Sequence, residues 1–412
     1  MTVTKNIKAF YNTEIPEGWS VSLLGELGTF SKGKGILKEQ VISDGLPCIR
    51  YGEIYTTHNF IIKKFKSFIS DDVANESKEI QNGDILFAGS GETIKEIGKA
   101  VAYVGNDKAY AGGDIIILST KKDFNPECLS YALETDFVKK QKRVLGQGNS
   151  VVHIYSSDLS KLKIPLPPLP EQKAIAQVLS TADAAIHTTE KLIAQKEIRK
   201  KWLMQQLLTG KRRLNSFNSE VKPKVVGQFL KEVSERNKDL KVTKILSVTN
   251  TRGFINQSDQ FDRSIASEDT SNYKIVKKGQ FAYNPSRVNV GSLDLLRNYD
   301  KGILSPMYVV FSTNEKQLLA DFLYFHLKTQ WFYGHIPMFV QGSVRDSLSF
   351  DGLCSMKFFI PTIEEQTAIT QVLQAADKEI SLLKAKAEKL REHKKGLMQA
   401  LLTGKVRLKV KE

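Results

Sequence analysis

Two short segments have part of the spacing that an adenine methyltransferase needs. Phe87-Ala88-Gly89-Ser90-Gly91 follows a strand-like run and fits the F-x-G-x-G pattern used to bind S-adenosylmethionine. The catalytic tetrad of such enzymes is Asn or Asp followed by Pro-Pro and an aromatic residue. Its nearest match, Asn284-Pro285-Ser286-Arg287, lacks the second proline and the aromatic ring that would stack on a flipped base. We therefore predict a non-catalytic chain, and a stand-alone or fused adenine DNA methyltransferase remains the alternative hypothesis.

Other catalytic patterns are weaker still. Thr209-Gly210-Lys211 resembles the end of a phosphate-binding loop, but Gln205 stands where that loop needs its first glycine. The 6 histidines are scattered and the carboxylates form no cluster with lysine, which disfavours a metal-dependent nuclease. The three cysteines, Cys48, Cys128 and Cys354, lie far apart, which favours a reducing compartment over a zinc site or disulfides. The sequence thus predicts no catalytic residue, no metal site and no cofactor bound by this chain.

Polar side chains in segments rich in Gly, Ser and Asn are of the types that read DNA bases. Arg and Lys make paired hydrogen bonds to guanine in the major groove, and Asn and Gln make them to adenine. The candidates in the first half of the chain are Lys32, Lys34, Arg50, Tyr51, Ser90, Thr93, Lys95, Gln147 and Asn149. Those in the second half are Arg252, Asn284, Ser286, Arg287, Asn289, Gln341, Ser343 and Arg345. We expect all of them in loops, where each reads a base, contacts a phosphate or is merely solvated, and Arg287 is the best candidate.

Two basic runs have more than one interpretation. Arg199, Lys200 and Lys201 fall within a helical pattern and are more typical of a solvated helix face than of a DNA contact. The run from Lys211 to Arg213 either caps a helix or binds phosphate, and the sequence favours neither.

The charge balance of the chain indicates a polyanionic partner. The 412 residues carry a formal net charge of +15, which suits nucleic acid, an anionic membrane surface or an acidic protein. No apolar run reaches the roughly 18 residues that span a bilayer, and the first residues lack the apolar stretch of a signal peptide. We expect a cytoplasmic protein that does not associate with a membrane.

A long internal repeat determines the predicted architecture. Residues 169–214 align without a gap with residues 363–408, at an offset of 194 that is given by Glu171 and Glu365. About half of the aligned positions are identical. Apolar residues recur at steps of three and four in both copies, which predicts two amphipathic helices of about 36 residues. A proline run that ends at Pro170 predicts a start at Glu171, and Gly210 and Gly404 fit the C-terminal caps.

Each predicted helix has a narrow apolar stripe that would remain exposed to water if the helix stood alone. The two copies are therefore expected to bury their stripes against each other as a coiled coil. Binding to a membrane surface is a weaker interpretation, because the polar faces mix acidic and basic residues.

The segments outside the repeat have short β-rich runs and few helical patterns. Runs such as residues 83–87, 100–104 and 114–118 have counterparts at residues 280–283 and 307–311. A helical stretch at residues 129–143 likewise matches one at residues 318–331. We predict an α+β protein with globular β-rich domains at 1–158 and 215–353, each followed by a helical region at 159–214 and 354–412.

Several motifs in order resemble one known family. They are the proline-rich entry to the first helix at residues 164–172, the Leu-Leu-Thr-Gly-Lys endings of both helices, Pro16-Glu17-Gly18-Trp19, residues 89–100 and residues 283–287. Together they resemble the specificity subunits of type I restriction-modification systems over nearly the whole chain. The second copy departs from the pattern, because residues 360–366 lack the proline run and the opening near residues 226–229 is indistinct.

That resemblance implies two target-recognition domains, each reading one half of a bipartite site in double-stranded DNA. It implies that an antiparallel helix pair sets the spacing and docks two adenine-methyltransferase subunits, and that two restriction subunits (endonuclease and translocase) can join. S-adenosylmethionine, ATP and Mg would then be used by the partner subunits. A purely structural coiled-coil adaptor is a third hypothesis, but it leaves the β-rich domains and the basic charge without a role.

Overall fold

The computed structural model describes residues 15–121, 124–148, 151–218, 220–257, 269–340 and 347–409. The chain divides into two compact units. Unit 1 comprises Met1–Thr189 and Lys386–Glu412, and unit 2 comprises Glu190–Ala385. The candidates Asn149, Gln341, Ser343 and Arg345 lie outside the described residues.

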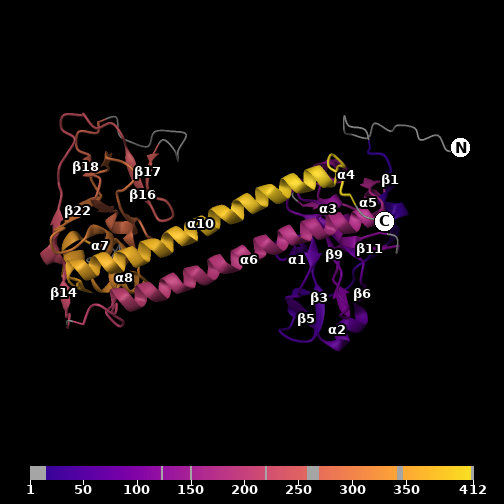
Figure 1. Ribbon diagram of the computed structural model, residues 1–412, viewed down its shortest axis with the longest axis horizontal. Helices are drawn as coiled ribbons and strands as arrows, with labels where there is room; N and C mark the ends of the chain where they lie inside the picture. The colour runs from indigo at the N-terminus through magenta and orange to yellow at the C-terminus, as the bar shows by residue number, and fades with distance from the viewer. Residues whose placement is uncertain are drawn as a thin grey trace. The chain divides into compact units, whose positions relative to one another are not determined.

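Unit 1 is built around a five-stranded sheet (Figure 1). Its strands are, in order, β2 (Gly28–Lys32), β11 (Ile115–Thr120), β7 (Ile85–Ala88), β9 (Ala100–Tyr103) and β4 (Ile61–Ile62). A four-stranded sheet follows the order β5 (Ser67–Ile69), β3 (Leu46–Ile49), β10 (Ala109–Ala111) and β6 (Lys78–Ile80). Two strand pairs complete the unit, β1 (Ser20–Leu23) with β13 (Lys163–Leu166) and β8 (Ser90–Gly91) with β12 (Val152–His153). The helices are α1 (Tyr51–Thr56), α2 (Asp71–Glu76), α3 (Pro126–Leu133), α4 (Asp136–Leu145) and α5 (Ser156–Leu159).

Unit 2 repeats the central part of this plan. Its sheet has the order β15 (Leu230–Glu232), β22 (Val309–Thr313), β19 (Phe281–Tyr283) and β20 (Leu293–Leu295). Three antiparallel pairs lie beside it: β14 (Pro223–Val225) with β23 (Lys357–Phe359), β16 (Leu246–Thr249) with β17 (Gly253–Asn256), and β18 (Lys274–Lys277) with β21 (Lys301–Leu304). Its short helices are α7 (Ala320–Leu327), α8 (Gln330–His335), α9 (Phe350–Ser355) and the 3-10 turn η5 (Pro285–Val290).

The repeated sequence forms two long helices, α6 (Leu169–Leu208) and α10 (Ile363–Leu401). They have 40 and 39 residues, so both are longer than predicted, and α6 begins two residues before the predicted start. Pro170 is tolerated there because the first backbone N–H groups of a helix need no partner within it. Gly210 and Gly404 follow the helix ends at φ of 69° and 70°, the left-handed conformation expected of a glycine cap.

The helical stretches predicted at residues 129–143 and 318–331 each form two helices instead of one. In unit 2, Thr329 takes extended backbone angles and its side chain accepts a hydrogen bond from the backbone N–H of Phe332. A threonine in this role begins a new helix, so it separates α8 from α7. Thr135 has the same extended conformation between α3 and α4 in unit 1.

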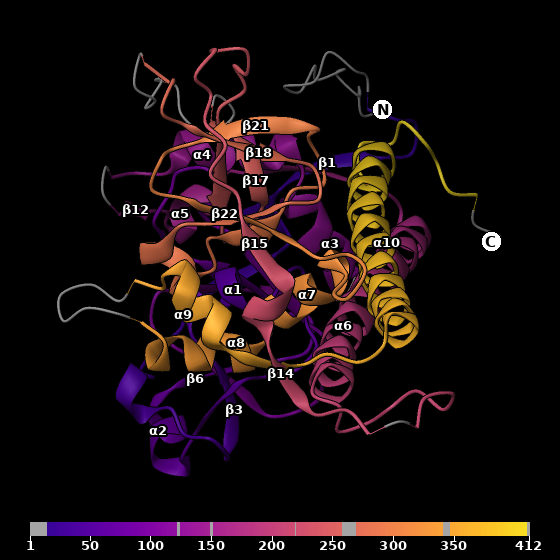
Figure 2. The same cartoon turned by 90° about the vertical axis from the view of Figure 1, so that its left-hand side faces the viewer.

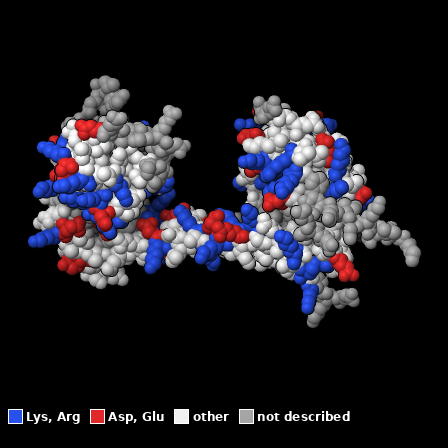
Figure 3. Space-filling view, turned by 90° about the horizontal axis from the view of Figure 1, so that it is seen from above, with Lys and Arg blue, Asp and Glu red and all other residues white. Residues whose placement is uncertain are grey.

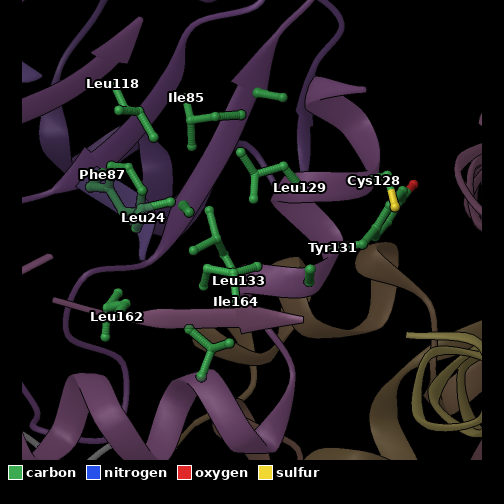
Figure 4. Packing of buried hydrophobic residues seen from close by; sticks show 14 of the residues in the cluster. Leu24, Ile85, Phe87, Leu118, Cys128, Leu129, Tyr131, Leu133, Leu162 and Ile164 are labelled. Atoms are coloured by element: carbon green, nitrogen blue, oxygen red, sulfur yellow. The ribbon is translucent and has the colours of Figure 1, made fainter. Parts of the chain in front are cut away.

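Each unit has its own hydrophobic core, to which both long helices contribute. In unit 1, strand residues such as Phe87 and Ile85 face Leu129 of α3 and Ile164 of β13 (Figure 4). The same cluster includes residues from the start of α6 and the end of α10. The main core of unit 2 takes residues from the end of α6 and the start of α10.

The two long helices run side by side and antiparallel within each unit (Figures 1 and 2). In unit 1, Lys394 of α10 pairs with Asp183 of α6 at 2.6 Å. In unit 2, Lys200 of α6 pairs with Asp377 of α10 at 2.5 Å. The predicted antiparallel pairing of the repeats is confirmed.

Candidate nucleic-acid interface

One edge of the main sheet in unit 1 collects several of the predicted reading residues. Strand β11 pairs with β2 through Ile116 and Lys32, and with β7 through Ile115 and Ala88. The end of β2 and the end of β7 therefore lie together where β11 begins. This edge places Lys32 near the segment that starts at Ser90.

Backbone hydrogen bonds bring two further segments to the same edge. The N–H of Lys34 donates to the carbonyl of Ala111 at 3.1 Å, at the end of β10. The neighbouring N–H of Gly112 donates to the carbonyl of Ile49 at 2.9 Å, directly before Arg50. The exposed Tyr51 follows as the first residue of α1.

Gln147 is held against this surface by a short antiparallel pairing. Gln147 and His153 exchange backbone hydrogen bonds of 2.9 and 2.7 Å, and His153 pairs in turn with Ser90 of β8. The hydroxyl of Ser90 lies 3.0 Å from Nδ1 of His153. Thr93 and Lys95 are exposed on the segment that follows β8. We name this set of segments (Lys32–Lys34, Arg50–Tyr51, Ser90–Gly98 and Gln147) surface 1.

Not all of these residues lie in loops as predicted. Lys32 ends β2, Tyr51 begins α1 and Ser90 belongs to β8, where its side chain is buried and engaged with His153. Arg50 is half-buried, and its Nε atom is buried without a hydrogen-bond partner. The strands and the helix at these positions are too short to leave a periodic pattern in the sequence.

In unit 2, the predicted residues lie on a hairpin turn and on η5. Arg252 is exposed in the turn between β16 and β17, where its N–H donates to the hydroxyl of Thr249 at 3.1 Å. The hydroxyl of Ser292, just after η5, donates to the carbonyl of Val248 at 2.8 Å. That bond places the hairpin beside η5. We name this set (Arg252 with Asn284–Asn289) surface 2.

The segment Asn284–Asn289 forms a 3-10 turn and not the expected loop. Asn284 caps it, because its side-chain oxygen accepts from the N–H of Ser286 at 3.1 Å. The side-chain amide of Asn284 also contacts the sulfur of Met307 at 3.6 Å. Ser286, Arg287 and Asn289 are exposed on the turn. Arg287 is thus exposed and remains a prediction as a base-reading residue, whereas the side chain of Asn284 caps the turn.

Three residues of the basic runs have roles that were not considered from the sequence, whereas Arg199 and Lys201 are exposed, as predicted for a solvated helix face. Arg213 forms a paired contact with both carboxylate oxygens of Glu365, whose side chain is fully buried. Lys200 pairs with Asp377 and lies 5.6 Å from the ring centre of Phe325. Arg212 lies 5.2 Å from the ring centre of Trp202. Arg213 and Lys200 therefore join α6 to α10 within unit 2.

Sequence reasoning missed the equivalent junction in unit 1. Glu171 accepts hydrogen bonds from Arg407 at 2.8 Å and from the indole of Trp19 at 3.1 Å. Burial raises the pKa of Glu171, but the bonds from Arg407 and Trp19 outweigh burial, so its pKa lies below the usual value. The signal was present in the repeat, because Glu171, Glu365, Arg213 and Arg407 are identical pairs at the offset of 194.

Lys and Arg side chains are numerous on both units, with carboxylates among them (Figure 3). Within the described ranges, no helix has the length and apolar character that crossing a bilayer requires. The same ranges contain no group of three or more His, Cys, Asp or Glu residues arranged to hold a metal ion.

Comparison with known proteins identifies what this arrangement belongs to. The family model "Type I restriction modification DNA specificity domain" matches twice, at residues 16–197 and 229–392. The MjaVIII specificity subunit of Methanocaldococcus jannaschii is 25% identical, with 98% of this chain and 97% of that protein covered. The putative MjaX specificity subunit of the same organism is 27% identical over the same shares.

Solved structures show the same fold. The type I restriction-modification S subunit from M. genitalium has a TM-score of 0.58 at 16% identity, with 95% of this chain and 97% of that chain covered. The HsdS subunit from Thermoanaerobacter tengcongensis has a TM-score of 0.50 at 15% identity, with shares of 96% and 99%. The resemblance and the fold class predicted from the sequence are confirmed, and the chain belongs to the type I restriction modification DNA specificity family, of which it carries two domains.

Proposed function

We propose that this chain reads a bipartite DNA sequence as the non-catalytic specificity subunit of a type I restriction-modification enzyme. The observation that carries the proposal is a repeated frame with two unlike surfaces. The order β2-β11-β7-β9 in unit 1 matches β15-β22-β19-β20 in unit 2, yet the segments that follow β7 and β19, residues 90–95 and 284–289, have no identical residue at the offset of 194. A common frame with different polar surfaces suits the reading of two different half-sites.

The recognition domains proposed are residues 1–158 and 215–353, with 159–214 and 354–412 as helical spacer regions. The proposed contacts of the first domain are Lys32, Lys34, Arg50, Tyr51, Thr93, Lys95 and Gln147, and those of the second are Arg252, Ser286, Arg287 and Asn289. Long charged or amide side chains on these surfaces can reach base edges or phosphates in the major groove. Ser90 and Asn284 are proposed to shape the surfaces, because their side chains are engaged within the protein.

The long helices are proposed to set the half-site spacing and to dock two adenine-methyltransferase subunits. Exposed apolar side chains on the helix segments of unit 2 support a protein partner there. Ile198 of α6 and Leu382 of α10 are 68% and 61% exposed. A partner that covers these two side chains would remove their apolar area from water.

The proposal is tested with the full chain purified together with its methyltransferase partner. This complex selects the DNA that it binds from a pool of randomised duplexes. Two short conserved blocks separated by a fixed gap are expected, with affinity that falls steeply as salt rises because bound phosphates release counterions. Arg287→Ala should relax one base position in one block only, by about 1–3 kcal/mol.

The matched control is Arg297→Ala. Arg297 is an exposed arginine of the same unit that pairs with Asp321, beyond the end of β20 that is opposite to surface 2. This variant should leave both blocks unchanged. Recovery of no conserved block, or relaxation of both blocks by Arg287→Ala, would contradict the proposal.

A further inference from the structure

A lysine and a carboxylate are buried together beneath surface 1. Nζ of Lys142, on α4, lies 2.9 Å from Oε1 of Glu134, and their side chains are 2% and 9% exposed. Burial lowers the pKa of Lys142, and the Glu134 carboxylate opposes that effect. Lys142 is among the most deeply buried charged residues of the unit.

The pair holds the backbone where the exposed segment of surface 1 ends. Nζ of Lys142 donates to the carbonyl of Gly98 at 2.8 Å. Oε1 of Glu134 accepts from the N–H of Ala100 at 3.2 Å, where β9 begins. Gly98 has a φ of 65°, and an added Cβ there would come within 3.2 Å of the Lys142 side chain. The lysine, the carboxylate and the glycine thus fix one end of the segment that carries Thr93 and Lys95.

The other end of the segment is fixed as well. The hydroxyl of Tyr55, on α1, donates to the carbonyl of Ser90 at 3.1 Å. The N–H of Ile154 donates to the carbonyl of Gly89 at 3.0 Å. The exposed residues between Gly91 and Ile97 therefore leave and rejoin the fold at two anchored points.

Unit 2 has a similar lysine–carboxylate pair that bonds to the backbone, made from other residues. Nζ of Lys328, which follows α7, donates to the carbonyl of Leu293 at 2.6 Å and lies 3.8 Å from Asp294. Oδ2 of Asp294 accepts from the N–H of Phe254 at 3.3 Å, next to the turn that carries Arg252. A half-buried lysine and a carboxylate again join a helical element to the backbone beneath a proposed reading surface.

Stability alone gives little reason for such pairs. Removing a lysine and a carboxylate from water has a large cost, and apolar residues of similar volume in their place are often as stabilising or more so. What an apolar pair cannot supply is a directed hydrogen bond to one carbonyl and one N–H. Hydrogen bonds of this kind hold contact residues in the geometry that selective recognition needs.

We propose that Lys142 with Glu134, and Lys328 with Asp294, are positioning residues that hold surfaces 1 and 2 in the conformation that distinguishes bases. This inference rests on the proposed DNA-reading function. Loss of a pair should weaken the preference for the correct half-site while leaving the sequence-independent attraction to phosphates in place.

The test replaces the pair in unit 1 by apolar residues of similar size, Lys142→Met with Glu134→Leu. The dissociation constants of the full chain, with its methyltransferase partner, are measured for the selected duplex and for duplexes altered in one half-site. The ratio of these constants should fall about tenfold for one half-site and stay unchanged for the other. Binding to a duplex without the site should not change, and hydrogen exchange of residues 92–98 should become faster.

The matched control is Lys394→Met with Asp183→Leu. This buried pair of unit 1 joins α10 to α6, and Lys394 also lies 3.6 Å from the ring centre of Phe60. The control should leave both ratios as they are. A folded Lys142/Glu134 variant with undiminished discrimination would overturn the inference, as would an equal loss in the control.

A milder variant covers the case in which the double variant does not fold. Tyr55→Phe keeps the ring and removes only the hydrogen bonds to Ser90 and Glu96 at the other anchored end. It should reduce discrimination at the same half-site by a smaller factor, and an unchanged ratio would count against the inference. A wild-type complex that prefers no duplex would instead refute the proposed function.

Discussion

The two units form the same helix junction from exchanged parts of the repeat. In unit 1, Glu171 at the start of α6 pairs with Arg407 beyond the end of α10. In unit 2, Glu365 at the start of α10 pairs with Arg213 beyond the end of α6. Each residue of one pair is 194 positions from its counterpart in the other. A tandem repeat in the sequence thus produces two equivalent junctions, because each copy supplies the carboxylate to one unit and the arginine to the other.

A second pair repeats in the same way but in different surroundings. Lys394 in unit 1 is 8% exposed against Asp183, which also accepts a hydrogen bond from the hydroxyl of Tyr131 at 2.7 Å. Lys200 in unit 2 is 23% exposed, and Phe325 occupies the position that matches Tyr131. The comparison shows that the repeat preserves the ion pairs of the frame while the β-rich part of each unit determines how far they are buried.

The largest difference in stability between the units is expected when the arginine of each Glu–Arg junction is removed. Arg213→Ala would leave the fully buried Glu365 carboxylate without its guanidinium partner, which typically costs about 3–5 kcal/mol. Arg407→Ala should cost roughly half as much, because Trp19 still donates to Glu171. Hydrogen exchange of the helix ends in each unit measures both losses separately. Arg212→Ala is the control, since Arg212 only covers the ring of Trp202. Equal losses for Arg213→Ala and Arg407→Ala would show that the two junctions do not differ.

A smaller difference is expected in acid. His326 on α7 is fully buried in unit 2, its Nε2 has no hydrogen-bond partner, and burial lowers its pKa to about 3. The matching residue of unit 1 is Ala132. A pKa that is depressed in the folded state contributes stability above the unfolded value of 6.5, and this contribution is lost as the pH falls from 6.5 towards 3.

Unit 2 should therefore lose up to about 1.4 kcal/mol of stability per pH unit in this window through His326. Unit 1 has no such contribution from position 132, although burial also lowers the pKa of His58 there, so the predicted difference concerns the share of His326 alone. Exchange rates in both units at pH 6.5 and 4.5, corrected for intrinsic exchange, measure the effect. His326→Phe should flatten the pH dependence of unit 2 and leave that of unit 1 as it was. An unchanged slope in the variant would assign the acid sensitivity to other groups.

The sequence predicted the frame of this protein well because local rules govern it. Gly210 and Gly404 lie in the left-handed conformation that a helix cap requires, and the strand-like runs predicted at residues 83–87 and 114–118 overlap the strands β7 and β11. Apolar steps of three and four define which face of a helix is buried, whatever packs against it. The pairing of the two helices also follows, because each stripe needs a partner, whereas the antiparallel direction was implied by the resemblance to the specificity subunits.

The partners of single polar residues could not be predicted in this way. Gln172 accepts from the N–H of Asn125, and Gln366 accepts from the N–H of Leu319, across 47 positions in both cases. Periodicity reports which side chains are buried, but the polar group that each one meets depends on the completed fold. The proposed reading residues are harder still, because exposed loop side chains leave no periodic signal and their roles depend on bases outside the chain.

The smallest predicted effect concerns the one hydroxyl by which the second ion pair differs between units. Burial raises the pKa of Tyr131, so its hydroxyl remains a donor to Asp183 at neutral pH. Tyr131→Phe removes a hydrogen bond to a charged group, which should cost about 1.5 kcal/mol in unit 1. Phe325→Tyr adds the same hydroxyl in unit 2, where Asp377 is more exposed, and should gain at most about 0.5 kcal/mol.

The variant that combines Tyr131→Phe with Phe325→Tyr should reduce the difference in stability between the Lys–Asp pairs of the two units, as measured by hydrogen exchange of α6 on either side of residue 190. If Phe325→Tyr stabilised unit 2 as much as Tyr131→Phe weakened unit 1, burial would not be what distinguishes the two pairs. The side chain at this one position, Tyr or Phe, would then account for the whole difference in stability between the two Lys–Asp pairs.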